Sequence, residues 1–173
     1  MQQYTLSLEP LNAGALLVQE PGGAVRPASR CEILAVARDL VSTEELRGQS
    51  LSEPRLVKEF LRLRLNQTLD YEVFGLILLD GQNHLIDYLE PFRGTINQSA
   101  VYPREVVKIA LQYGAVSLML VHNHPSGSTE ASQADIRLTQ HLTQALALVD
   151  VRVLDHFIVA GATVVSMAEK GLL

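Results

Sequence analysis

One strand-to-helix junction decides the fold of this chain. It covers residues 121–135 and has the sequence VHNHPSGSTEASQAD. The residues before it, Ala115 to Val121, form an apolar run without alternation, which predicts a strand buried on both faces. A Pro-Ser-Gly turn ends that strand, and Ser132 can cap a helix whose apolar residues recur at helical spacing as far as Val149. A buried strand followed by an amphipathic helix is typical of the α/β class.

The sequence outside this junction repeats the pattern of strands and helices. Proline stands at the first turn of two further predicted helices, at Pro54 and Pro103, where its missing N–H is harmless. Four apolar runs predict strands, and they cover Val73–Leu79, His84–Leu89, residues 151–160 and residues 162–167. Asp80-Gly81 between the first two indicates a hairpin. We therefore expect an α/β (α+β) fold in which helices flank one mixed β-sheet.

The first fifty residues are patterned more loosely than the rest. A helix is predicted over Cys31–Leu40, and short strands and a Pro-Gly-Gly turn precede it. We expect residues 1–50 to form an N-terminal appendage and residues 51–173 to form the main domain. Such an appendage, together with exposed sheet edges, would be compatible with a homodimer.

Composition and charge exclude several classes of protein. Apolar residues make up 47% of the chain and charged residues 19%, so it is neither disordered nor fibrous. A single cysteine excludes a disulfide scaffold. The chain starts without a basic segment and apolar run, and its apolar stretches are too short for a membrane span, so we expect a cytoplasmic protein without membrane contact.

The net charge of the chain, −5, argues against nucleic-acid binding as its main task. Arg55, Lys58 and Arg62 could share one face of a helix, but such runs of charge usually form a solvated face.

The junction also contains a set of metal-ligand residues. His122 and His124 are two apart on a strand, so their side chains point to the same side. Asp135 is three residues after Ser132, in the capping-box position, which holds it in the first helical turn. Either pair alone has an ordinary structural explanation. Together they predict a Zn²⁺ site, because two histidines and one carboxylate leave a fourth tetrahedral position open, as in catalytic zinc centres.

These residues resemble a known family. The spacing of the candidate ligands is similar to the JAMM motif of MPN-domain metalloproteases: His-x-His, then seven residues, Ser, two residues and Asp. From about Ser52 to the C-terminus the chain resembles the bacterial RadC family, in His-Asn-His-Pro-Ser-Gly at 122–127, Phe-Arg-Gly-Thr at 92–95, Val-Tyr-Pro-Arg-Glu at 101–105 and Asp-His-Phe-Ile-Val at 155–159. The resemblance implies an MPN/JAMM (cytidine-deaminase-like) architecture over residues 51–173. The helix-hairpin-helix region of that family is not evident in the first fifty residues.

The resemblance also assigns roles to site residues. It implies that His122, His124 and Asp135 hold zinc and that Ser132, besides capping the helix, holds the catalytic water or the oxyanion. Glu72 precedes the strand Val-Phe-Gly-Leu-Ile-Leu and is similar to the upstream glutamate that acts as general acid and base in JAMM enzymes. Glu105 is the alternative base, although its place in a first helical turn explains it without catalysis.

Three functions remain after this reasoning. The leading hypothesis is a zinc-dependent hydrolase, a peptidase or isopeptidase acting on a peptide or protein. The alternatives are a DNA-repair or mobile-element accessory protein associated with nucleic acid, and a non-catalytic MPN scaffold. His156 could support the metal ligands or form a structural pair with Asp155.

Overall fold

The computed structural model describes residues 16–19, 23–29, 32–33, 46–65, 69–94 and 101–173. The chain divides into two compact units, residues 1–41 and 42–173. In the first unit β1 (Leu17–Gln19) pairs antiparallel with β2 (Val25–Pro27). Most of the helix predicted over Cys31–Leu40 lies outside the described residues, and the domain boundary expected after residue 50 stays a prediction.

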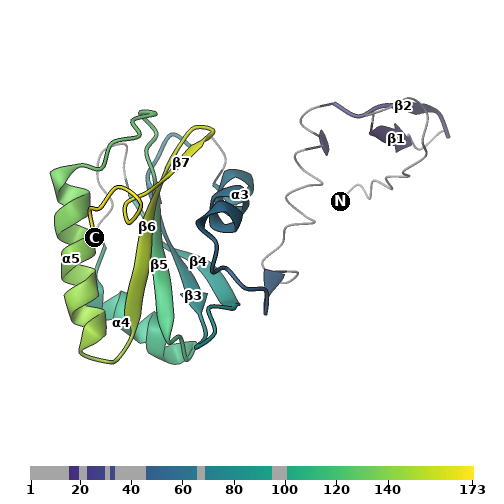
Figure 1. Ribbon diagram of the computed structural model, residues 1–173. Helices are drawn as coiled ribbons and strands as arrows, with labels where there is room; N and C mark the ends of the chain where they lie inside the picture. Colours follow the sequence, from purple (N-terminus) through teal and green to yellow (C-terminus); the bar gives the residue numbers. More distant parts are fainter. Residues whose placement is uncertain (1–15, 20–22, 30–31, 34–45, 66–68, 95–100) are drawn as a thin grey trace. The chain divides into compact units, whose positions relative to one another are not determined.

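The second unit is built on a five-stranded mixed sheet with the strand order β4-β3-β5-β6-β7 (Figure 1). The strands are β3 (Val73–Leu79), β4 (Leu85–Arg93), β5 (Ser117–Asn123), β6 (Arg152–Ala160) and β7 (Thr163–Ser166). β5 and β6 are parallel, and the other neighbours are antiparallel. The predicted mixed sheet and α/β class are confirmed.

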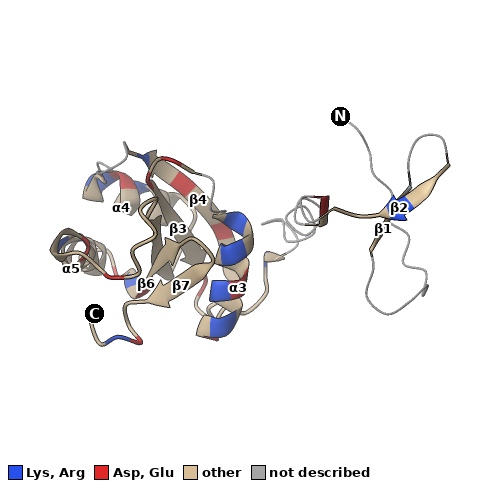
Figure 2. Cartoon of the chain, turned by 90° about the horizontal axis from the view of Figure 1, so that it is seen from above, with Lys and Arg blue, Asp and Glu red and all other residues tan. Residues whose placement is uncertain are grey.

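Helices cover both faces of this sheet. α4 (Pro103–Gln112) and α5 (Gln133–Ala147) lie on one face, and α3 (Pro54–Arg64) lies on the other (Figure 2). The main core lies between the sheet and helices α4 and α5. There Leu76 and Leu120 of the sheet pack in one cluster with Val106 of α4 and Leu142 of α5. Burial of these branched side chains supplies the hydrophobic stabilisation that holds α5, and therefore Asp135, against the sheet.

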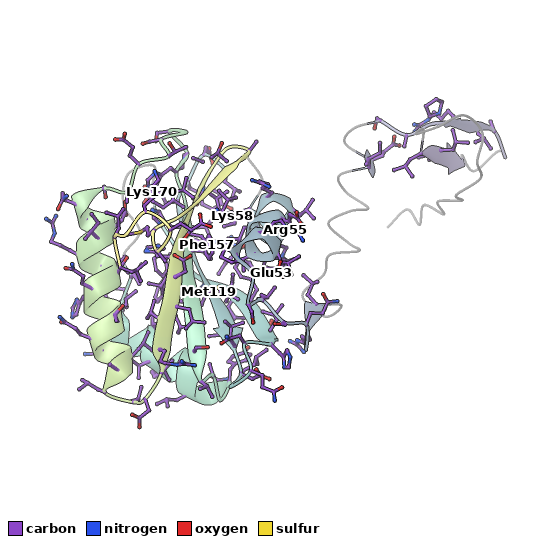
Figure 3. The ribbon with its side chains drawn as sticks, in the orientation of Figure 1. Glu53, Arg55, Lys58, Met119, Phe157 and Lys170 are labelled. Atoms are coloured by element: carbon purple, nitrogen blue, oxygen red, sulfur yellow. The ribbon has the colours of Figure 1, made fainter. Side chains whose placement is uncertain are left out.

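α3 packs through one apolar face. Its buried side chains are Val57, Phe60 and Leu61, whereas Leu56 is 36% exposed. Phe60 meets the ring of Tyr88 edge-on, with the ring centroids 5.3 Å apart. Near the start of α3 a cavity of about 190 Å³ separates the helix from the sheet, and Met119 and Phe157 form part of its lining (Figure 3).

β4 is longer than predicted. The sequence suggests a strand that ends at Leu89, but β4 continues to Arg93. The reason is a register shift opposite Gly75, between the pairs Phe74–Phe92 and Leu76–Leu89. Pro91 lies in this irregular segment on an edge strand, one of the few places in a sheet where proline is tolerated.

Within the described ranges, every helix is too short or too polar to cross a bilayer.

Candidate metal centre

Three potential metal ligands meet where β5 ends and α5 begins. The Nε2 atoms of His122 and His124 are 2.9 Å apart. Asp135 presents one carboxylate oxygen 3.3 Å from Nε2 of His122 and the other 3.6 Å from Nε2 of His124. The ligand atoms of the three residues all lie within 4.8 Å of one another. The structure therefore brings together the three residues that the sequence selected, in a group that could hold a metal ion.

The spacing of this group fits a tetrahedral cation. Zinc–ligand bonds of about 2.0–2.2 Å at tetrahedral angles place neighbouring ligand atoms about 3.4 Å apart. The separations of 2.9, 3.3 and 3.6 Å between the atoms of His122, His124 and Asp135 bracket that value. The donor types, two imidazoles and one carboxylate, are also those that zinc takes in catalytic centres.

The second ring nitrogen of His124 is committed to a backbone carbonyl. Its Nδ1 lies 2.7 Å from the carbonyl oxygen of Ser128, in the loop between β5 and α5. A carbonyl oxygen can only accept, so Nδ1 carries the proton when the ring is neutral, and Nε2 then carries a lone pair. A carbonyl partner on the remote nitrogen is the usual way in which proteins orient a metal-binding histidine.

The second ring nitrogen of His122 meets another histidine. Nδ1 of His122 is 2.8 Å from Nε2 of His156, which is fully buried on the neighbouring strand β6. Burial holds the pKa of His156 well below its usual value, and the nearby charge of His122 acts in the same direction. His156 is therefore neutral and belongs to the surroundings of the site.

Asp155 and His156 do not form a side-chain pair. Adjacent strand residues point to opposite faces of a sheet, and the Asp155 carboxylate instead accepts bonds from the Ser166 hydroxyl at 2.5 Å and the Ala168 backbone N–H at 3.0 Å. Of the two possibilities that the sequence left open for His156, contact with a proposed ligand is the one observed.

Asp135 is held by a reciprocal capping box. The Ser132 hydroxyl oxygen accepts a bond from the Asp135 backbone N–H at 3.1 Å, and the Asp135 carboxylate accepts one from the Ser132 backbone N–H at 2.7 Å. Burial opposes ionisation of Asp135, but bonds from His122 and His124 outweigh it and hold its pKa far below the usual range. Asp135 is thus an oriented anion at the helix N-terminus, where the helix dipole favours negative charge.

Glu72 lies beside this group, just before β3. Burial raises the pKa of its carboxyl, while the charges of His122 and His124 act to lower it and that of Asp135 to raise it. Phe74, two residues further on, pairs with His122 in the sheet, so Glu72 lies at the same end of the sheet as the candidate ligands. A carboxyl that is half-buried near a cation site, with a raised pKa, is suited to exchanging protons near neutral pH.

The backbone around Glu72 is fixed by Asn123, the residue between the two histidines. The Asn123 side-chain oxygen accepts a bond from the Val73 N–H at 2.6 Å, and its amide donates to the Tyr71 carbonyl at 3.0 Å. On the other side, the Glu72 carbonyl accepts the Gly94 N–H at 2.8 Å. Asn123 therefore sets the position of Glu72 relative to the histidines.

The alternative base, Glu105, has a different environment. It lies in the first turn of α4, where its carboxylate accepts a bond from Lys108 at 2.8 Å. Among the contacts of the described residues, none joins Glu105 to His122, His124 or Asp135. An ion pair within the helix is sufficient to explain this residue.

The basic face predicted on α3 is largely neutralised. Lysine and arginine gather on this helix (Figure 2), but Arg55 contacts Glu59 at 2.9 Å and Lys58 contacts Glu169 at 2.5 Å. Figure 3 shows Arg55 and Lys58 on the helix beside the apolar residues of the sheet. Ion pairing of two of the three predicted cations agrees with a solvated face.

Sequence reasoning missed two residues around the site: Asn123, which bonds the backbone on both sides of Glu72, and Thr139, whose hydroxyl oxygen lies 2.6 Å from Nδ1 of His156. Both act through contacts between segments that are far apart in the sequence, so no local spacing reveals them. The only signal was that Asn123 is a polar residue in a strand otherwise predicted to be buried, where a side-chain amide needs partners. Thr139 carries no such signal, because a threonine within a helix usually bonds its own backbone.

These residues define a candidate two-histidine, one-carboxylate centre on an α/β domain. Residues 51–172 match the family model described as the RadC-like JAB domain. The chain belongs to this family.

Similar relatives come from several bacteria. A UPF0758 protein of Leptothrix cholodnii is 49% identical over 168 residues, which cover 92% of this chain and 75% of that protein. One from Methylibium petroleiphilum is 51% identical over 150 residues, 85% of this chain and 67% of the relative. One from Vibrio cholerae is 49% identical over 142 residues, 82% of this chain and 89% of the relative.

Proposed function

We propose that this chain is a zinc-dependent metallohydrolase that cleaves an amide bond in a peptide or protein, as a peptidase or isopeptidase. One observation carries the proposal: His122, His124 and Asp135 lie together in a group that could hold a metal ion, at the end of the sheet where Glu72 precedes β3. Three protein ligands and a neighbouring proton carrier are the minimum that metal-assisted hydrolysis needs.

The donor set assigns the metal to His122, His124 and Asp135. When bound, zinc would polarise the scissile carbonyl and lower the pKa of a water molecule toward about 7. Glu72 accepts a proton from the attacking water and delivers it to the nitrogen of the leaving amine as the C–N bond breaks. Its raised pKa supports the first part of this exchange, since a carboxylate of higher pKa is a stronger base toward the attacking water.

Ser132 has a second role beside its cap. Its oxygen accepts the Asp135 N–H, which leaves the hydroxyl hydrogen free to donate. The side chain is exposed at the start of α5, next to Asp135. We assign the hydroxyl to hydrogen bonding with the water or with the negative oxygen that develops on the substrate carbonyl.

The first experiment measures zinc binding. Purified protein is stripped with a chelator, reloaded with zinc and analysed for metal by mass spectrometry. One zinc per chain is expected for the wild type and for Glu72→Gln, with none retained by His122→Ala or Asp135→Asn. A wild-type chain that retains no zinc, or a His122→Ala chain that remains fully loaded, refutes the ligand assignment.

The second experiment measures turnover. The zinc-loaded protein is incubated with a library of proteome-derived peptides, and new termini are identified by mass spectrometry. We expect cleavage by the wild type, none by Glu72→Gln, and undiminished cleavage by the matched control Glu105→Gln. Loss of cleavage in Glu105→Gln alone would transfer the role of base to Glu105.

The same pair of experiments separates the proposal from a non-catalytic scaffold. A scaffold would bind zinc through the same ligands, but Glu72→Gln would then leave every measured property unchanged. An isopeptide-containing set of branched peptides is included in the library, because a narrow preference for branched substrates would otherwise resemble inactivity.

A further inference from the structure

A continuous chain of buried hydrogen bonds runs behind the metal centre and joins two of its proposed ligands. It leads from the backbone carbonyl of Asp135 through the side chains of Thr139 and His156 to the ring of His122. Thr139 is 2% exposed, His156 is 0% exposed and His122 is 6% exposed, so water does not compete for these bonds.

We propose that Thr139 and His156 are positioning residues that fix which ring nitrogen of His122 carries its proton, so that Nε2 is the metal-binding atom. The proposal rests on the function proposed above, since it concerns the same metal centre. It assigns a purpose to a buried threonine and a buried histidine that hydrolysis itself does not use.

The direction of each bond follows from the Asp135 end. The Thr139 hydroxyl lies 2.7 Å from the Asp135 carbonyl oxygen, which can only accept, so the single hydroxyl hydrogen is directed there. The same hydroxyl oxygen lies 2.6 Å from Nδ1 of His156. With its hydrogen already used, the oxygen must accept at this second contact, and Nδ1 of His156 must carry the proton.

The contacts of the two rings determine the next bond. The ring of His156 has two polar contacts, Thr139 on Nδ1 and His122 on Nε2. The contact with Thr139 places the proton of the ring on Nδ1, so Nε2 of His156 keeps its lone pair and accepts, and Nδ1 of His122 donates across the 2.8 Å between them. The lone pair of His122 is left on Nε2, the atom that faces His124 and Asp135.

The two histidine ligands thus have different supports. His124 is oriented by the carbonyl of Ser128, which no side-chain substitution removes. His122 is oriented by side chains alone. Thr139 lies one helical turn beyond Asp135 on α5, so a single helix positions one ligand directly and orients another through His156.

Three substitutions on α5 test this assignment. Thr139→Val keeps the shape of the side chain but removes both bonds of the hydroxyl. Thr139→Ser keeps the hydroxyl. Thr143→Val is a matched control, because the Thr143 hydroxyl makes the same kind of bond, 2.8 Å to the carbonyl four residues earlier, without touching a histidine.

The readout is zinc affinity, measured by competition with a coloured chelator in samples whose helical circular dichroism matches the wild type. We expect Thr139→Val to bind zinc about 10- to 100-fold more weakly, the range typical for loss of a residue that orients a ligand. Thr139→Ser should restore affinity to near the wild-type value, and Thr143→Val should not change it. Equal zinc affinity in Thr139→Val and wild type refutes the assignment.

A second readout does not depend on the metal or on the folding of any variant. Long-range ¹H–¹⁵N correlation spectra of the metal-free wild type report which nitrogen of each histidine carries a proton. His156 is expected to carry its proton on Nδ1, and a proton on Nε2 overturns the proposal. Failure of the proposed zinc site gives a different result, because then the wild type itself binds no zinc, whereas failure of hydrolysis alone abolishes turnover and leaves both readouts as predicted.

Discussion

Replacing Asn123 by alanine should separate metal binding from turnover. The substitution removes the acceptor for the Val73 N–H, at 2.6 Å, and the donor to the Tyr71 carbonyl, at 3.0 Å. Val73 is buried, so its unpaired N–H should lower stability by about 1–3 kcal/mol. The half-buried Tyr71 carbonyl can turn to water, and its lost bond adds about 0.5–1.5 kcal/mol.

The sum is a loss of about 2–4 kcal/mol. For a domain of this size, each kcal/mol lowers the melting temperature by about 2–4 °C, so a decrease of about 5–15 °C is expected. Without the two hydrogen bonds of Asn123, we expect Glu72 to shift relative to the histidines. Displacement of a catalytic group by about 1 Å lowers turnover by about 100-fold. Zinc affinity should remain near the wild-type value, because none of the three ligands is altered.

The assay combines thermal unfolding, zinc competition and turnover of a peptide identified in the library screen. Ser117→Ala is the control, since it removes a 3.3 Å bond to Asn83 at the opposite end of the same strand. That variant should keep full turnover. The reasoning fails if Asn123→Ala melts within 2 °C of the wild type, or if it loses zinc as completely as His122→Ala.

Three further predictions concern the cap, pH and nucleic acid. Ser132→Ala should lower stability by about 1 kcal/mol through loss of the helix cap, and Ser132→Thr should recover most of it in a thermal unfolding assay. In the metal-free protein the bond to Asp135 raises the pKa of His124. The His124–Asp135 pair therefore contributes its full stabilisation at pH values below the unfolded-state pKa of histidine, about 6.5, and this contribution is lost as the pH rises through the folded-state pKa of His124. Added zinc must displace that proton, so the rise in melting temperature caused by zinc should grow between about pH 6 and pH 8; a constant rise would contradict this. Binding to DNA at low salt should be undetectable, given a net charge of −5 and ion-paired Arg55 and Lys58, whereas a steep salt-dependent affinity would favour the accessory-protein alternative.

The elements that sequence predicts well are those defined by local pattern. β3 is an apolar run, β5 is apolar from Leu118 to Val121, and every residue of both strands is buried. The Ser132–Asp135 spacing gives a capping box in the structure. The extension of β4 through Pro91 could not be predicted, because it depends on a register shift against β3 that compensates for the missing N–H of proline.

The candidate ligands were predictable for the same reason. His122 and His124 share a strand, and Asp135 follows after one short loop, so their convergence is encoded within fourteen residues. The supports around them were not, because Asn123 contacts a segment fifty residues away and His156 meets His122 only through the pairing of β5 with β6. Long-range partners of this kind require the register of the sheet.

The one parallel pair of strands in the sheet has a consequence for how this protein can change over time. β5, α5 and β6 form a single uninterrupted segment, and it supplies the three candidate ligands together with Thr139 and His156. Glu72 comes from another part of the chain and is attached to this segment by Asn123. The residues proposed to hold the ion and the residue proposed to move the proton are therefore encoded in separate parts of the chain, so a descendant that lost Glu72 alone would still carry all three candidate ligands and both of the side chains that we propose position them.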